Sequence, residues 1–243
     1  MRKNGVNLSL LNETPVSCSF YVEYSVPILC FQSYDLVMKS VRFIAVLFCI
    51  LFFQLSAFGK EKKLIILGDS LTEGYGVAQE AAFPAIIQKK FVADKSEWII
   101  QASGSSGSTS ASALGRMKWL AKDKPDAILI LMGSNDGLRG FKPEETEKNL
   151  GEAIQWAQKN KIKIILGQLY VPPNYGKDYE KKFSAIYSRL AKKFKIPLAP
   201  FLLDKVAGQS ELNQVDGIHP NEKGHAIVAE NIYRYLKSEL PKL

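Results

Sequence analysis

The chain has 243 residues, of which 47% are hydrophobic and 23% are charged, and these fractions are ordinary for a globular protein. It carries 32 basic and 24 acidic residues. The lysines are scattered over amphipathic segments and no nucleic-acid-binding motif accompanies them, so we expect no nucleic-acid partner. The three cysteines, Cys18, Cys30 and Cys49, all precede residue 60. The remainder of the chain therefore cannot be a thiol enzyme or a cysteine zinc site.

An uninterrupted apolar run, Phe43 to Phe53, lies near the N-terminus. Lys39 and Arg42 precede it and Ala57-Phe58-Gly59 follows it, a pattern typical of a secretory signal peptide. The uncharged stretch is short for a membrane span, which needs about 20 apolar residues. We therefore predict a signal peptide over 38–59, cleaved near Gly59, and an exported chain that is periplasmic or secreted. An uncleaved N-terminal anchor and a buried core helix are the alternatives.

Residues 1–37 precede this predicted signal peptide, although such a peptide should begin near the start of its protein. Met38-Lys39 would make a natural start. We therefore interpret 1–37 as an upstream extension that arises from a misassigned start codon.

After Gly59, short apolar runs alternate with longer amphipathic segments. In chain order we expect a strand at 64–67, a helix at 83–92, a strand at 98–100, a helix at 110–122, a strand at 127–132, a helix at 143–159, a strand at 162–166, a helix at 179–194, a short strand at 198–201 and a helix at 221–240. Strands that are continuously apolar indicate burial on both faces, as in a parallel sheet between helices. Residues 60–243 thus predict one three-layer α/β domain, whose ligands bind beyond the carboxyl ends of the strands.

Four polar clusters occupy the loops of this predicted domain. They are Gly68–Thr72, Gly104–Thr109, Gly133–Asp136 and Asp216–Pro220. The first three directly follow the first three strands, so they converge on one edge of the sheet. The fourth precedes the last helix and can reach the same edge.

A serine hydroxyl becomes a nucleophile only beside a base, and the chain has two histidines, His219 and His225. Asp216 lies three residues before His219, close enough through a turn to hold the imidazole Nδ1–H. His225 falls within the closing helix without such a carboxylate, and we expect it to be a packed or surface helix residue. Ser70, Asp216 and His219 are therefore the candidate catalytic residues.

The remaining clusters fit an oxyanion hole, whose donors point at developing negative charge. Ser70 and Gly107 can each offer a backbone N–H, and Asn135 can offer its side-chain amide. Taken singly, the clusters also fit purely structural roles: Asp69 or Ser70 as a helix cap, the Gly/Ser loop as a mobile turn, and Asn135-Asp136-Gly137 as a simple turn. No second histidine or acidic cluster stands at ligand spacing from Asp-Gly-Ile-His, so we expect no metal.

Together these residues resemble the SGNH (GDSL) hydrolase superfamily over about residues 63–240. The segments IILGDSLTEGYGV, GSTS from Gly107, GSNDGLRGF and VDGIHPN are similar to four of its sequence blocks. The segments Leu131–Phe141, Asn174–Gly176 and Phe183–Tyr187 resemble the bacterial periplasmic thioesterase/lysophospholipase/arylesterase branch. The nucleophile motif is not Gly-x-Ser-x-Gly, which counts against the α/β-hydrolase fold.

The resemblance implies a flavodoxin-like fold with a five-stranded parallel sheet of order 2-1-3-4-5. It implies a Ser70–His219–Asp216 triad and an oxyanion hole made by Ser70, Gly107 and Asn135. It also implies that Gly137–Phe141 is a mobile loop beside an acyl groove. The expected substrate contacts are Asp69, Gly137, Leu138 and Phe141. Members of this branch need no cofactor or metal.

The expected activity is hydrolysis of small acyl esters, acyl thioesters or lysophospholipids through an acyl-serine intermediate. Two alternatives stay open: a carbohydrate O-deacetylase on the same scaffold, and a catalytically silent ligand-binding module. We expect a small-molecule acyl ester or thioester as partner, transient contact with membrane lipid, and a monomer.

Overall fold

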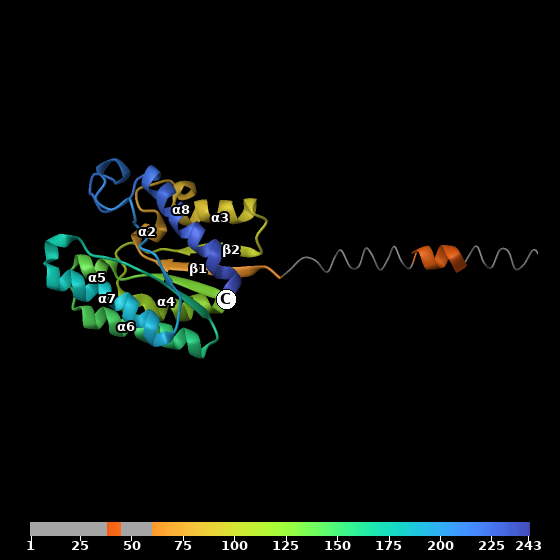
Figure 1. The fold of residues 1–243 in the computed structure, drawn as a ribbon, viewed down its shortest axis with the longest axis horizontal. Coiled ribbons are helices and arrows are strands. Elements are labelled where there is room, and N and C mark those ends of the chain that lie inside the picture. Colours follow the sequence, from red (N-terminus) through yellow and green to blue (C-terminus); the bar gives the residue numbers. More distant parts are fainter. Residues whose placement is uncertain (1–37, 45–59) are drawn as a thin grey trace, which may run out of the picture. The chain divides into compact units, whose positions relative to one another are not determined.

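A parallel β-sheet organises the computed structural model, which describes residues 38–44 and 60–243. Its strands in that part of the chain are β1 (Lys62–Gly68), β2 (Trp98–Ser103), β3 (Ala127–Leu131), β4 (Lys163–Gly167) and β5 (Leu198–Ala199). Their order is β2-β1-β3-β4-β5, and every neighbouring pair is parallel (Figure 1). The predicted flavodoxin-like sheet is confirmed.

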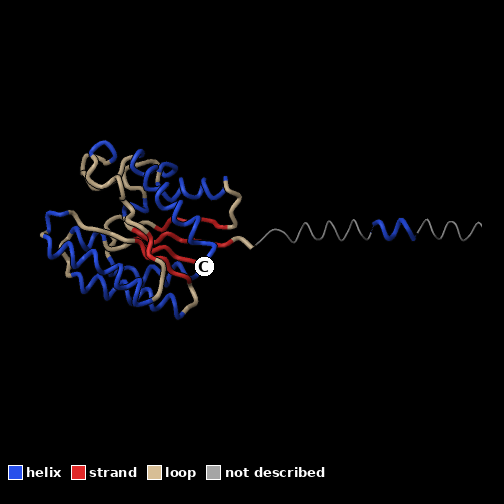
Figure 2. The backbone as a smooth tube through the Cα atoms, in the orientation of Figure 1, coloured by secondary structure: helices blue, strands red, loops and turns tan. Residues whose placement is uncertain are grey.

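Helices cover both faces of this sheet. They are α2 (Ser70–Glu73), α3 (Phe83–Ala93), α4 (Ala113–Leu120), α5 (Ser134–Leu138), α6 (Pro143–Lys159), α7 (Lys177–Phe194) and α8 (Glu222–Glu239). In Figure 1, α3 and α8 lie together above the sheet, and α4, α6 and α7 lie below it. The strands, red in Figure 2, thus form the middle of three layers.

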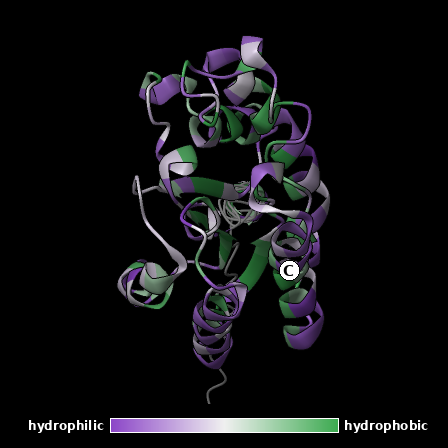
Figure 3. Cartoon of the chain, turned by 90° about the vertical axis from the view of Figure 1, so that its left-hand side faces the viewer, coloured by the Kyte–Doolittle hydropathy of each residue, from purple (hydrophilic) through white to green (hydrophobic). Residues whose placement is uncertain are grey.

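The core follows from the apolar runs in the central strands. Every residue of Leu64–Leu67 in β1 and Ala127–Ile130 in β3 is fully buried, because helices cover these strands from both sides. The edge strand β2 instead alternates buried and exposed positions, and Ile99 is 36% exposed. Figure 3 shows the hydrophobic residues in the strands and on the helix faces turned toward them.

Local signals set the helix ends. Pro143 opens α6, Glu144 and Glu145 lie in its first turn and Lys159 in its last, an arrangement that suits the helix dipole. Asn221 caps α8, since its side-chain oxygen accepts the Gly224 N–H at 3.1 Å. These two helices begin within a residue of the predicted positions.

The short helices α2 and α5 were not expected, and β2 runs to Ser103 where the predicted strand ended at 100. Two other elements are clearly shorter than predicted. The helix expected at 110–122 is reduced to α4, with 3₁₀ turns at Ser110–Ser112 and Ala121–Asp123. The Ser110 N–H donates to the Asp136 carboxylate at 2.8 Å at one end, and Lys124, with a φ of 49°, ends the segment at the other. The strand expected at 198–201 is only Leu198–Ala199, since Pro197 and Pro200 flank it and proline cannot donate to a strand ladder.

The chain divides into two units, Met1–Phe58 and Gly59–Leu243, and the sheet belongs to the second. In the first unit, residues 38–44 are helical and exposed. Most of the predicted signal peptide over 38–59, and all of 1–37, lie outside the described residues. Among the residues that are described, no helix is long and apolar enough to span a bilayer.

Candidate active site

Ser70 lies where β1 ends and α2 begins. Asp69 caps this one-turn helix, because its Oδ1 accepts the Leu71 N–H at 3.1 Å. Ser70 is the first residue of α2, so its own N–H is one of the donors that a helix leaves without an internal partner. The Ser70 hydroxyl and the Ser70 backbone N–H therefore both lie at the carboxyl edge of the sheet.

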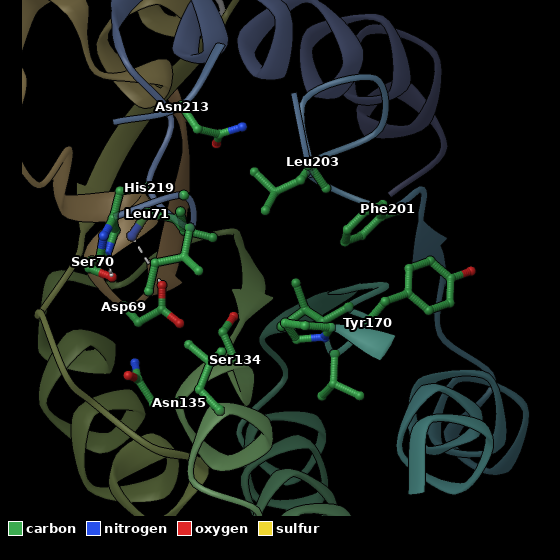
Figure 4. Close-up of a pocket in the computed structure, with 18 residues that line it drawn as sticks. Asp69, Ser70, Leu71, Ser134, Asn135, Tyr170, Phe201, Leu203, Asn213 and His219 are labelled. Carbon is green, nitrogen blue, oxygen red and sulfur yellow. Dashed lines mark hydrogen bonds between the residues drawn. The ribbon is translucent and has the colours of Figure 1, made fainter. Parts of the chain in front are cut away.

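His219 lies between Ser70 and Asp216. Its Nε2 is 2.9 Å from Ser70 Oγ, and its Nδ1 is 2.7 Å from Asp216 Oδ2 (Figure 4 shows the pair Ser70–His219). A carboxylate facing Nδ1 favours the tautomer in which Nδ1 donates and Nε2 accepts. The imidazole is thus oriented to take the Ser70 proton.

The second oxygen of Asp216 organises the loop itself. Oδ1 accepts the N–H groups of Ile218 and His219, each at 3.0 Å. Burial alone would raise the pKa of Asp216, but hydrogen bonds from the His219 ring and from these N–H groups outweigh it and lower the pKa below its ordinary value. The carboxylate therefore stays charged beside the imidazole.

The turn that carries His219 is fastened to the loop after α2. The Gln214 side chain donates to the carbonyls of Tyr75 at 2.7 Å and Pro220 at 2.9 Å. The ring centroids of Tyr75 and His219 are 4.8 Å apart. Ser70 and His219, 149 residues apart in sequence, are thereby held in register.

Two of the predicted oxyanion donors involve the Gly/Ser loop, Gly104–Thr109: Gly107 belongs to the loop and Asn135 contacts it. Asn135, in α5, donates from Nδ2 to the Ser108 carbonyl at 3.1 Å, which leaves its second amide hydrogen for another acceptor. Gly107 is exposed with a φ of +74°, and within the described residues its N–H has no protein acceptor. Gly104 instead packs on α2, where a Cβ would lie 2.1 Å from the Glu73 nitrogen.

A cavity of about 450 Å³ opens beside Ser70 and His219. Its polar side is formed by Asp69, Ser70, Ser134, Asn135 and His219 (Figure 4). Its opposite wall is apolar and comes from the loops after β4 and β5: Leu169, Tyr170, Val171, Pro172, Phe201, Leu203 and Ala207. The rings of Tyr170 and Phe201 meet there edge to face, with centroids 4.7 Å apart.

Asp69 lies beside Ser70, and both residues line this cavity. It is 1% exposed, and its Oδ2 has no hydrogen-bond partner among the described residues. Burial raises its pKa, although the hydrogen bond from the Leu71 N–H and the nearby Ser134 side chain act in the opposite direction. The carboxyl therefore caps α2 through one oxygen, while the other is buried without a partner in the part of the chain that the structure describes. In the described residues, this site included, no three His, Cys, Asp or Glu side chains gather as metal ligands would.

The family model of the GDSL-like lipases and acylhydrolases matches residues 66–227, a range that spans the site from Ser70 to His219. The chain belongs to the GDSL-like Lipase/Acylhydrolase family.

Individual relatives agree with this membership. The chain is 40% identical to "Thioesterase 1/protease 1/lysophospholipase L1" of Escherichia coli K12 over 72% of its length and 83% of the relative. It is 35% identical to an arylesterase of Vibrio mimicus over 81% of its length and all of the relative. This acylhydrolase is an ester-hydrolysing enzyme.

The solved structures give the same result for the fold. A crystal structure of the psychrotrophic esterase EstA from Pseudoalteromonas, inhibited by monoethylphosphonate, superposes with a TM-score of 0.72 at 33% identity. The match covers 74% of the acylhydrolase and 99% of that chain.

The four predicted substrate contacts of the acylhydrolase separate into two pairs. Asp69 and Leu138 line the cavity, whereas Gly137 and Phe141 do not. Gly137 lies behind the wall, because a Cβ there would be 2.3 Å from Val171 Cγ1. Phe141 is 41% exposed, its N–H donates to the Asp136 carbonyl, and its carbonyl accepts the Tyr179 hydroxyl. The first two residues of the expected loop, Gly137 and Leu138, are the last two residues of helix α5.

His225 takes no part in this constellation of the acylhydrolase. It is 1% exposed in α8, its Nδ1 accepts the Phe83 N–H at 3.3 Å, and its ring stacks on Phe83. It therefore fastens α8 to the start of α3.

Two features of the site carry no signal in the sequence motifs: the apolar wall and one half-buried cation. The wall follows the carboxyl ends of β4 and β5, a position that the strand-end rule could have indicated, but its apolar residues resemble ordinary core. Arg116, in α4, donates to the carbonyls of Gly68 at 2.7 Å and Ser103 at 2.5 Å. It thereby ties together the ends of β1 and β2.

Proposed function

We propose that this chain is an exported serine esterase and thioesterase that uses Ser70 as nucleophile, His219 as base and Asp216 as the group that orients the base. The observation that carries the proposal is the hydrogen-bonded series from Asp216 through His219 to Ser70, which ends at a largely apolar cavity. A hydroxyl, an aligned base and a charged partner are what acyl transfer requires.

In the first half of the reaction, Ser70 Oγ attacks the acyl carbon and its proton passes to His219 Nε2. The carbonyl oxygen becomes an oxyanion, for which the N–H groups of Ser70 and Gly107 and the Asn135 amide are the donors. The bond to the leaving group then breaks, and His219 protonates the departing alcohol or thiol. Ser70 is left as an acyl ester.

In the second half, a water molecule attacks this ester while His219 Nε2 accepts its proton. The same donors hold the second oxyanion. When it collapses, the bond between the acyl carbon and Ser70 Oγ breaks, the free acid leaves, and Ser70 Oγ takes the proton back from His219 Nε2. The negative charge of Asp216 stabilises the imidazolium in both halves.

The apolar wall bears on the choice of substrate. Most residues of this wall have no side-chain hydrogen-bonding group for a sugar, and they match an acyl chain of several carbons: Leu169, Val171, Pro172, Phe201, Leu203 and Ala207. This favours acyl esters, acyl thioesters and lysophospholipids over carbohydrate O-acetyl groups. The names of the relatives, thioesterase, lysophospholipase and arylesterase, point the same way. The uninterrupted series from Asp216 to Ser70 argues against a silent binding module.

We also propose that the chain is exported by its N-terminal signal sequence, acts as a monomer and touches membrane lipid transiently. Tyr170 and Ile218, which line the cavity, are 49% and 42% exposed, so apolar surface continues from the cavity to its rim. Fractionation of cells that express the full chain tests the export.

A substrate panel tests the proposed activity. Purified protein is assayed with p-nitrophenyl esters and acyl-CoA thioesters of graded chain length, beside acetylated xylose, and each rate is compared with that of Ser70→Ala. We expect kcat/KM to rise from acetyl to medium chains and to disappear in Ser70→Ala. Turnover of the acetylated sugar alone would favour the O-deacetylase instead.

A further inference from the structure

The Gly/Ser loop, Gly104–Thr109, is bound to α2 by a side chain that the proposed mechanism does not use. Glu73 Oε2 accepts the Ser106 N–H at 2.6 Å and the Ser106 hydroxyl at 2.5 Å. Glu73 is thus the acceptor for both donors of one loop residue, 33 positions further along the chain.

Glu73 and Ser70 belong to the same single helical turn. The N–H groups of Gly74 and Tyr75 both donate to the Ser70 carbonyl at 3.0 Å. These bonds hold the end of the turn to the backbone of Ser70. Gly104 lies against the same turn, since a Cβ there would be 2.1 Å from the Glu73 nitrogen and 2.4 Å from its Cα. Two separate contacts therefore join the loop to the helix that carries Ser70.

The loop residue that Glu73 holds is adjacent to the proposed donor. The Gly107 N–H belongs to the peptide group between Ser106 and Gly107, so fixing Ser106 limits the directions in which that N–H can point. The other side-chain contacts of the loop act on later carbonyls: Arg139 on Gly107, at 3.1 Å, and Asn135 on Ser108, at 3.1 Å. The Ser108 N–H donates to the Ser105 carbonyl at 3.1 Å and closes a turn around the Ser106–Gly107 peptide. Because a glycine follows this central peptide, the turn allows either orientation of the peptide, and the bonds from Ser106 to Glu73 select one of them.

We propose that Glu73 is a positioning residue for the oxyanion hole: it sets the place of the Gly107 N–H relative to the Ser70 N–H by tying Ser106 to the nucleophile helix. The inference rests on the proposed function, which assigns both N–H groups to the oxyanion. Its contribution comes from geometry and not from charge, because a carboxylate near a developing oxyanion is itself unfavourable. An uncharged acceptor of the same length should therefore serve equally well.

The experiment compares Glu73→Ala, Glu73→Gln and Ser106→Ala with wild type and with Glu80→Ala, a matched removal of an exposed glutamate. Each variant is assayed for kcat and KM on p-nitrophenyl butyrate, and for the inhibition constant of an aryl trifluoromethyl ketone. Ser70 Oγ adds to this ketone, its proton moves to His219, and the ketone oxygen becomes an oxyanion in the same site.

For Glu73→Ala we expect kcat to fall about 10- to 100-fold with KM nearly unchanged, a smaller loss than the roughly 10²–10³ that follows removal of a donor. The inhibition constant should rise by the same factor as kcat/KM falls, which a general loss of folding would not produce. Glu73→Gln should remain within about threefold of wild type. Ser106→Ala keeps its backbone bond to Glu73, so its loss should be smaller, and Glu80→Ala should be unaffected.

The inference is overturned if Glu73→Ala keeps its kcat and its affinity for the ketone while Asn135→Ala loses both. It is also overturned if Glu73→Gln is as impaired as Glu73→Ala, since the charge would then be the active feature. A lower melting temperature of Glu73→Ala with unchanged kcat, measured well below that temperature, assigns the residue to stability alone. A wild-type protein that neither hydrolyses any ester nor binds the ketone would instead remove the proposed function, and the inference with it.

Discussion

His219 and His225 are six residues apart in sequence and lie in opposite kinds of environment. His219 occupies the turn before α8, where one ring nitrogen meets a carboxylate and the other a hydroxyl. His225 lies inside the helix, where its Nδ1 accepts a backbone N–H and its ring stacks on Phe83. The difference shows that the partners of the two ring nitrogens, and not the residue type, decide whether a histidine can exchange protons with a substrate.

The largest expected effect separates the two histidines by activity. His219→Ala should lower kcat/KM by at least about 10³-fold, because Ser70 Oγ loses its proton acceptor. His225→Asn should keep most of the wild-type activity at about pH 8, since the amide oxygen can still accept the Phe83 N–H. Initial rates with p-nitrophenyl butyrate measure both. If His225→Asn lost activity and His219→Ala kept it, His225 at the α3–α8 contact would be the base and the proposed triad would be excluded.

The second effect separates proton transfer from stabilisation of the oxyanion. Asn135→Ala leaves the His219 side of the site intact and should lower kcat by about 10²–10³ with little change in KM. Asn160→Ala, at the exposed end of α6, is the matched control. A change in KM alone would identify Asn135 as a binding residue that fastens the Gly/Ser loop through Ser108.

The third effect concerns stability and belongs to His225. Burial lowers its pKa to about 4, from 6.5 in an exposed histidine. The unfolded chain therefore takes up a proton below pH 6.5 that the folded chain refuses until about pH 4. Folding stability should fall as the pH falls through this window, by up to about 3 kcal/mol.

Urea unfolding between about pH 7 and about pH 4 measures this dependence. His225→Asn loses the buried ring that stacks on Phe83, so its stability should be lower than that of wild type at neutral pH. Because Asn does not titrate, its stability should also vary less across the window. An equal slope for both proteins would show that another group is responsible. Asp216, whose pKa is lowered, contributes stability that is lost only at lower pH, as the carboxylate protonates.

The smallest expected effect tests the apolar wall. Ala207 lines the cavity and is exposed, so Ala207→Leu adds volume there with little strain on the core. It should lower kcat/KM about three- to tenfold for the longest acyl chains and leave acetyl esters unchanged. Ala207→Ser, which adds almost no apolar volume, is the control. A uniform loss over all chain lengths would place the acyl chain elsewhere.

The polar half of the site was predictable because its partners are encoded at short range. Asp216 and His219 are three residues apart, and the capping of α2 by Asp69 follows from the motif itself. The ends of three successive strands gather the rest at one edge, so the apolar runs of β1, β2 and β3 were sufficient to bring Ser70 and Asn135 to one cavity.

The remainder depends on tertiary contacts that no local pattern records. Leu169 and Phe201 look like core residues in sequence, and only the sheet order makes them a cavity wall. Gly137 reads as part of a turn but is needed where Val171 approaches closely. The bond between Glu73 and Ser106 joins two exposed residues 33 positions apart, for which neither hydropathy nor spacing gives a signal.

The double role of Asp216 has a consequence for the interval between the two halves of the proposed reaction. Once Ser70 is acylated, its Oγ can no longer donate to His219 Nε2, and the imidazole loses one of its two anchors. Oδ2 still holds Nδ1, while Oδ1 holds the N–H groups of Ile218 and His219 and so keeps the turn closed. The His219 ring therefore keeps its orientation throughout the lifetime of the acyl-enzyme. Its Nε2 is already placed to accept a proton when water enters.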